Sequence, residues 1–181
     1  MELTNAARAV TDIAYSVICE MLGPGLDNLT NAKIELKHKP NEGKSLIEVR
    51  CQQDAEREGK TLVLRLHFLH DARQMQIPNI LMPETMTHQR LGKRLIGALY
   101  RVAAANDYLL LVVDMVPSFY DRLLLRGATP VDEETVLITA NTDLEGDVGS
   151  PKITAGEDDE HFDIFAWMKG AANNTTGNKA E

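Results

Sequence analysis

The amino-acid sequence predicts an α+β fold in which helices flank a central, mixed and mostly antiparallel sheet. Three observations lead to this fold class. An amphipathic helical pattern opens the chain, three alternating strand-like segments follow one another without a helix, and strand-like and helical segments then alternate over residues 76–139. Successive strands joined by short turns pair in antiparallel fashion, whereas a strand–helix–strand unit brings two parallel strands together.

The first expected element is an amphipathic helix near the N-terminus. Thr4 or Asn5 is a suitable cap for its start. The Gly23-Pro24-Gly25 stretch is expected to end it, because glycine and proline together interrupt a helix. Six apolar side chains recur at helical spacing and predict its buried face: Val10, Ile13, Ala14, Val17, Ile18 and Met21.

Three segments with alternating apolar and polar residues follow the helix. They lie at residues 33–37, 47–51 and 62–69, and turn-prone or polar stretches separate them at residues 40–43 and 54–59. Alternation of this kind is typical of strands that bury one face and expose the other. The three segments therefore predict an antiparallel meander.

The second half of the sheet is expected to be built differently, because helices separate its strands. Pro78 interrupts the first of these strands and predicts an edge or a bulge. The continuous apolar run at residues 108–113 is typical of a strand that is covered on both faces. The expected elements are, in order, a strand at 76–82, a helix at 88–105, a strand at 108–113, a helix at 118–125 and a strand at 135–139.

Size and composition limit the kind of protein. The chain has 181 residues, and we expect one domain over residues 1–140, followed by an acidic and polar tail at 141–181 in which residues 162–168 form a docking segment. A net charge of −8 argues against binding to nucleic acid, and no apolar run is long enough to cross a membrane. Cys19 and Cys51 lack metal-ligand spacing, and no signal peptide is evident, so we expect a cytoplasmic protein with reduced thiols.

A cationic helix start follows the strand at 76–82. Gly92, Lys93 and Arg94 lie where the helix at 88–105 begins. The start of a helix presents unpaired N–H groups and the positive end of the helix dipole, and glycine allows a ligand to approach the backbone. This combination predicts a site for a phosphate or pyrophosphate group. The alternative is a solvated cationic helix start without a ligand.

The stretch from Leu81 to Ile96 resembles the central motif of the GNAT superfamily of N-acyltransferases. In that motif a strand and a short loop lead to a Gln/Arg-x-x-Gly-x-Gly/Ala stretch that opens a helix. In one alignment Gln89 and Gly92 fill the first and fourth positions, and Arg94 replaces the second glycine. In the other, which we favour because it keeps the apolar stripe of the helix in phase, Gly92 is the last glycine and Arg90 replaces the first.

The resemblance covers about residues 61–139, the acyl-CoA-binding half, and it implies a fold, a cofactor and a reaction. The cofactor would be acetyl-CoA or another acyl-CoA, and an amine would attack the thioester directly. Backbone amides around Arg90–Arg94 would hold the pyrophosphate, and the splayed strand with Ile80 and Leu81 would pair with the pantetheine arm. The implied cofactor-binding residues are Ile80, Leu81, Met82, Gln89, Arg90, Leu91, Gly92, Lys93 and Arg94.

The stretch at residues 118–128 resembles the family's Phe-Tyr helix. Tyr120 matches the tyrosine that protonates the leaving thiolate, a role that suits a phenol because it keeps its proton at neutral pH. Seen alone, such a tyrosine is more often a packing residue. For the general base, Glu84 is our first candidate. Three further candidates lie near the expected strand ends: His67, His70 and Asp114.

The acceptor and the assembly stay open at this point. The acceptor would be an amine-bearing small molecule or protein, and a homodimer is one option for the oligomeric state. A catalytically inactive GNAT-fold binding or assembly module is the alternative function, since one glycine of the motif is replaced. A generic α/β protein with a chance motif is the third reading.

Overall fold

The computed structural model describes residues 3–52, 59–87 and 90–145. The chain divides into two units, Met1–Ser150 and Pro151–Glu181, and all described residues belong to the first. Gln89 and the expected docking segment at 162–168 lie outside the described residues. The helices and strands are α1 (Asn5–Leu26), β1 (Thr30–Lys39), η1 (Pro40–Glu42), β2 (Lys44–Gln52), β3 (Thr61–Leu69), β4 (Gln74–Ile80), η2 (Glu84–Met86), α2 (Leu91–Ala105), β5 (Leu109–Val112), α3 (Pro117–Leu125), β6 (Thr129–Pro130) and β7 (Val136–Ile138).

The strands form one seven-stranded sheet in the order β1-β2-β3-β4-β5-β7-β6. Only β4 and β5 are parallel, and every other pair of neighbours is antiparallel. The α+β fold class with a mixed, mostly antiparallel sheet is therefore confirmed. Each expected strand is present with ends shifted by up to three residues, whereas the two-residue strand β6 was not predicted.

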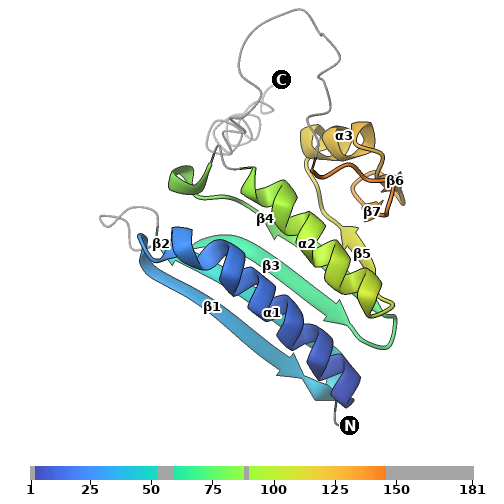
Figure 1. Cartoon of the computed structure of the whole chain (residues 1–181), viewed down its shortest axis with the longest axis horizontal. Coiled ribbons are helices and arrows are strands. Elements are labelled where there is room, and N and C mark those ends of the chain that lie inside the picture. The colour runs from blue at the N-terminus through green and yellow to red at the C-terminus, as the bar shows by residue number, and fades with distance from the viewer. Residues whose placement is uncertain (1–2, 53–58, 88–89, 146–181) are drawn as a thin grey trace, which may run out of the picture. The chain divides into compact units, whose positions relative to one another are not determined.

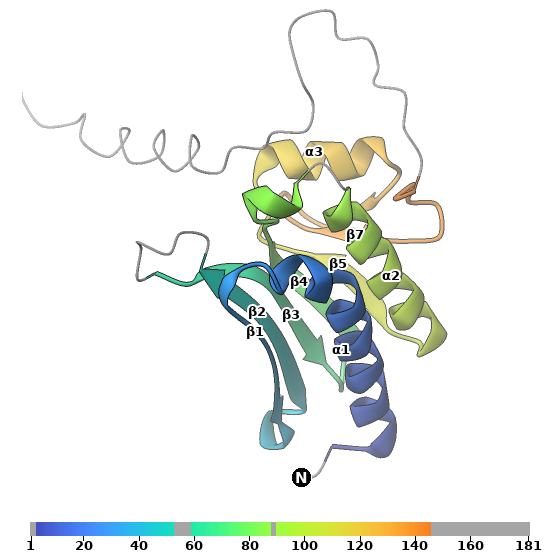
Figure 2. The same ribbon diagram turned by 60° about the vertical axis from the view of Figure 1, so that its left-hand side comes forward.

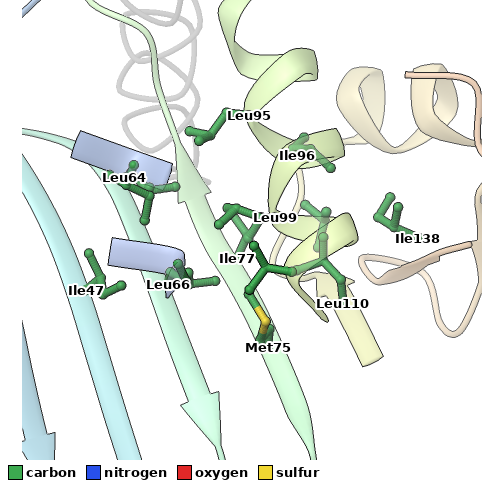
Figure 3. Packing of buried hydrophobic residues seen from close by; sticks show 14 of the residues in the cluster. Ile47, Leu64, Leu66, Met75, Ile77, Leu95, Ile96, Leu99, Leu110 and Ile138 are labelled. Carbon is green, nitrogen blue, oxygen red and sulfur yellow. The ribbon is translucent and has the colours of Figure 1, made fainter. Parts of the chain in front are cut away.

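Helices α1 and α2 lie next to each other on the same face of the sheet (Figures 1 and 2). No described helix lies on the opposite side of β1 to β3 in Figure 2. The buried side chains between the sheet and these two helices form the core, to which α2, β5 and β7 all contribute. Figure 3 shows part of it: Ile47, Leu64, Leu66, Met75, Ile77, Leu95, Ile96, Leu99, Leu110 and Ile138.

The expectation that the Gly23-Pro24-Gly25 stretch ends α1 was wrong, because the helix continues through this stretch to Leu26. Leu22 and Leu26 are both buried, and the N–H group of Asp27 donates to the Gly23 carbonyl at 2.9 Å. Burying two leucines contributes about 3–6 kcal/mol. Proline inside a helix costs about 3 kcal/mol, so the packing outweighs the local preference.

The start of α1 agrees with the sequence, and so do three of the six residues expected in its buried stripe, whereas Val17 and Met21 are only partly buried and Ile13 is exposed. The Thr4 hydroxyl accepts a hydrogen bond from the Ala7 N–H group at 3.1 Å, so Thr4 is the cap. Ile13 is 46% exposed and does not belong to the buried stripe. That stripe consists of Ala7, Val10, Thr11, Ala14, Ile18, Leu22 and Leu26.

Pro78 lies at a bulge, as the sequence predicts. Arg65 of β3 pairs with Asn79 of β4, but His67 pairs with Gln76, so β4 contains one extra residue around Pro78. A bulge bends its strand and increases the local twist. This bend in β4 occurs where the strand separates from β5.

Candidate functional site

Strands β4 and β5 pair over four residues and then separate. Their parallel ladder runs from Gln74–Leu109 to Ile77–Val112. The last bond joins the N–H group of Val113 to the carbonyl oxygen of Ile77 at 3.1 Å. The bulge of β4 begins at the same point, so the ladder and the regular strand end together.

Beyond this point the two chains follow different neighbours. β4 stays with β3, since Ile80 pairs with Leu64 and the Leu81 N–H group donates to the Val63 carbonyl at 2.7 Å. The chain after β5 bonds instead to the segment before β7, through the Met115 N–H group and the Glu134 carbonyl at 3.1 Å. The two strands therefore form a fork that opens between Ile80 and Met115.

The first turn of α2 lies against the β4 side of this fork. A Cβ atom added to Gly92 would lie 3.9 Å from both the Ile80 Cδ1 and the Met82 Cγ atoms. Arg90 precedes the helix in the left-handed conformation, with φ 52° and ψ 23°. The Arg90 side chain makes no capping hydrogen bond to this helix start. Its N–H groups and the positive end of the helix dipole are the chemistry that binds phosphate groups.

The residues expected at the site fall into two groups. Ile80 and Met82 come together with Gly92 at the fork, and Leu91 is 7% exposed there. Tyr120 lies on α3, half-buried and packed against the core. Glu84 is exposed in η2, and no hydrogen bond or ion pair joins it to Tyr120 within the described ranges.

His67 lies in the middle of β3 and has an unusual environment. Its Nε2 atom is buried and has no hydrogen-bond partner among the described residues. Burial, followed by the positive charge of Arg65, lowers the pKa of His67 below its ordinary value. A neutral imidazole with a free nitrogen is chemically able to accept a proton. Asp114, at the other side of the fork, is exposed and has φ 54°.

His70 is not available as a base at the fork, because it lies at the opposite end of β4 and both ring nitrogens are engaged. Its Nε2 atom is 2.8 Å from the Ser45 hydroxyl, and its Nδ1 atom is 2.8 Å from the Tyr108 hydroxyl. Ser45 also contacts His38 Nδ1 at 2.9 Å. The ring of Phe68 stacks on His70 with 5.8 Å between centroids. We call the chain His38–Ser45–His70–Tyr108 the polar chain.

The polar chain was not predicted from the sequence. One signal for it lies in the hairpin between β1 and β2. A turn at residues 40–43 places His38 directly opposite Ser45, and that register is observed. The contact of His70 with Tyr108 has no comparable signal, because it joins the residue after β3 to the residue before β5 through the tertiary fold.

Two cavities lie away from the start of α2. One, of about 270 Å³, borders the polar chain at His70 and Tyr108 and extends to Arg73, Asn106 and the first residues of α1. The other, of about 90 Å³, lies on the face of the sheet that the helices leave open. Within the described residues, no group of three or more His, Cys, Asp or Glu side chains is arranged to hold a metal ion. None of the described helices has the length and apolarity needed to cross a bilayer.

Comparisons of this chain with protein-family models, with curated proteins and with solved structures found no match. The geometry of the fork and the identities of its residues are therefore the basis for the function.

Proposed function

We propose that this chain is an acyl-CoA-dependent N-acyltransferase that transfers an acetyl group from acetyl-CoA to an amine. The proposal depends above all on the fork between β4 and β5, with the start of α2 against it. A fork of this kind leaves backbone groups of β4 without a neighbouring strand, so an extended, amide-containing arm can pair with them. The pantetheine arm of acetyl-CoA is such a ligand.

The start of α2 supports the same proposal. In the alignment that we favour, Arg90 stands where the GNAT motif has its first glycine. Arg90 has φ 52°, a conformation that glycine adopts without strain and other residues adopt rarely. The backbone at Arg90 therefore has a conformation that suits a glycine, which supports the alignment that we favour. Lys93 and Arg94 add positive charge to the same turn, which favours a pyrophosphate.

The proposed reaction uses few protein groups. The amine nitrogen would attack the thioester carbonyl carbon, the C–S bond would break, and Tyr120 would give its phenolic proton to the departing thiolate. Glu84, directly or through water, would accept the proton that the amine loses, and His67 is the second candidate for this role. The acceptor would be an amine-bearing small molecule or protein.

Binding of acetyl-CoA is the first test. At about 1 mM acetyl-CoA the melting temperature should rise, because a ligand that binds the folded state stabilises it by mass action. Gly92→Asp should abolish the rise, since it places a carboxylate in the proposed pyrophosphate site. A Cβ atom fits there at ordinary contact distance, so the variant should fold. Ala6→Asp is the matched control, because it adds the same charge at the equivalent exposed position of α1.

Turnover is the second test. Tyr120→Phe should lower the acetylation rate at least about tenfold while acetyl-CoA still raises the melting temperature, as expected for a lost general acid. An unchanged rate would remove Tyr120 from the chemistry. No melting shift in the parent chain would contradict the acyl-CoA proposal itself.

A catalytically inactive binding or assembly module is the second candidate function. Two observations favour it: Arg90 replaces a glycine of the motif, and the candidate base Glu84 is exposed on η2. Acetyl-CoA binding without turnover across a panel of small amines, peptides and protein N-termini would favour this candidate over the enzyme.

A further inference from the structure

We propose that the open face of β1 to β3 contains a binding site for a phosphate-type oxyanion between Lys33, Arg50 and Lys60. This site is independent of the fork, because it lies on the opposite face of the sheet from α2 and uses none of the same residues. It does not depend on the proposed acyltransferase activity.

The pairing of β1 with β2 places like charges opposite each other. Lys33 pairs with Arg50, and Glu35 pairs with Glu48. Like charges directly opposite on neighbouring strands destabilise the sheet unless other groups compensate them. We call Lys33 with Arg50 the cation row and Glu35 with Glu48 the carboxylate row. Each row needs groups of opposite charge to compensate its repulsion.

The carboxylate row is satisfied by the protein itself. Glu48 is 6% exposed, and its Oε1 atom accepts hydrogen bonds from Arg65 Nε at 2.9 Å and from Arg65 Nη2 at 2.7 Å. Burial raises the pKa of Glu48, but the bonds from Arg65 and the charge of Arg50 outweigh this effect, so the net pKa is lowered. Glu35 is bonded to both Lys33 and Lys37, which lower the pKa of its carboxyl to about 2.

The cations around the cavity outnumber the carboxylates. Each of the two carboxylates is shared by at least two cations, and Lys60 has no ion pair among the residues that the structure describes. Counted over the described residues alone, the cluster contains five cations (Lys33, Lys37, Arg50, Lys60 and Arg65) and two carboxylates, which leaves an excess of three positive charges. This excess is local, because the chain as a whole carries −8.

A cavity of about 90 Å³ lies between these side chains, lined by Lys33, Glu35, Glu48, Arg50 and Lys60. A single water molecule needs roughly 10–15 Å³ of such space, so a tetrahedral oxyanion fits. Three cations around one anion make charge-assisted hydrogen bonds, and the guanidinium of Arg50 suits a phosphate geometrically. The anion would relieve the repulsion between Lys33 and Arg50. The ligand class is therefore inorganic phosphate or a phosphate monoester.

The test is an NMR titration of the full chain with inorganic phosphate, with chloride used to hold the ionic strength constant. Saturable shifts of the backbone amides of Lys33, Arg50 and Lys60 are expected, and acetate should give weaker binding because it carries one charge. Lys60→Gln should weaken phosphate binding about tenfold through the loss of one charge-assisted hydrogen bond. Lys39→Gln is the matched control, since Lys39 lies on β1 as Lys33 does, does not line the cavity and pairs with Glu42 at 3.7 Å.

Lys60→Gln is also the safest variant for folding, because Lys60 is exposed and precedes β3. Arg50→Gln is the second variant, and it should weaken binding at least as strongly. Equal affinity in the parent, Lys60→Gln and Lys39→Gln proteins would overturn the proposal, as would shifts that never saturate. Unchanged phosphate binding in Gly92→Asp would separate this site from the fork.

Discussion

The two ends of β4 differ in how they join their neighbours. At the end that begins with Gln74, the polar chain joins β1, β2, the residue after β3 and the residue before β5 through three hydrogen bonds of 2.8–2.9 Å. At the end that finishes with Ile80, β4 pairs with β3 alone, and β5 has turned away. We call these the closed end and the forked end.

The two ends of β4 therefore differ in how the chain around them is hydrogen-bonded. At the closed end the buried Ser45 and the half-buried His70 and Tyr108 bond to one another, and a hydrogen-bonded network of this kind rigidifies a structure. At the forked end β4 has β3 as its only strand neighbour among the described residues, and the first turn of α2 lies against it. Proteins commonly concentrate such unsatisfied local features at functional sites and compensate for them elsewhere. Four predictions test this comparison, in order of decreasing effect.

Ile77→Ala tests how much the packing between the two ends contributes to stability. Ile77 is fully buried and is the last residue of β4 in the ladder with β5, so it lies between the two ends. Removing its side chain should lower the free energy of unfolding by about 2–5 kcal/mol, because a cavity remains in the core. Urea unfolding would measure this loss. Ile13→Ala, at an exposed isoleucine, should change stability by less than about 0.5 kcal/mol.

Ser45→Ala weakens the closed end selectively. Ser45 is 2% exposed, and both His38 and His70 lose a partner when its hydroxyl is removed. The free energy of unfolding should fall by about 1–3 kcal/mol, because two hydrogen bonds worth about 0.5–1.5 kcal/mol each are lost. Ser16→Ala is the control, because the Ser16 hydroxyl bonds to the Asp12 carbonyl at an exposed position. Equal losses in both variants would contradict the structural role of the polar chain.

Acid should weaken the closed end through His70. Burial, followed by the charge of His38, lowers the pKa of His70 in the folded protein, while nearby Asp71 raises it. Above an unfolded-state pKa of about 6.5 neither state binds the proton, so stability is unaffected. As the pH falls below that value the unfolded state binds more protons, and stability decreases by up to about 1.4 kcal/mol per pH unit for each such histidine.

Unfolding midpoints between about pH 7.5 and pH 5 would measure this effect, since carboxylates stay largely ionised over that range. His67 shifts in the same direction, so the parent protein should show both contributions. His70→Gln should remove only one of them. A pH dependence identical to that of the parent would show that His70 does not contribute.

Arg90→Gly should have the smallest effect on stability and a clear effect on function. Relief of the left-handed strain is worth about 1–2 kcal/mol, and the flexibility of glycine in the unfolded state offsets about 0.5–1 kcal/mol of it. Arg73→Gly is the control, because Arg73 has φ 48° at the closed end. Both variants should gain slightly in melting temperature, but only Arg90→Gly should change the affinity for acetyl-CoA.

The regular parts of the fold could be predicted from local patterns. Alternation at 62–69 identified β3, and Leu64, Leu66 and Phe68 form its buried face. The position of Pro78 identified the bulge in β4. The end of α1 was missed, because the burial of Leu26 depends on packing that a glycine-proline signal does not contain.

The site could be predicted only in part. The sequence indicated which residues begin α2, and the structure adds that Gly92 lies against Ile80 and Met82. Arg90 gave no local signal for its left-handed backbone, since arginine rarely adopts it. The polar chain and the charge rows of β1 and β2 depend on strand register, which composition alone does not specify.

Strand β1 lies at one edge of the sheet, and that position affects how the protein behaves at high concentration. Unpaired edge strands can nucleate aggregation by adding strands from other molecules. β1 contains a register shift after Thr30, beside Asn31 with φ 52°, and it carries lysines at positions 33, 37 and 39. Irregular geometry and lysine charge both disfavour fibril-like stacking. Replacing these lysines with threonine or valine should therefore make concentrated samples aggregate sooner, at substitutions that still leave the fold unchanged.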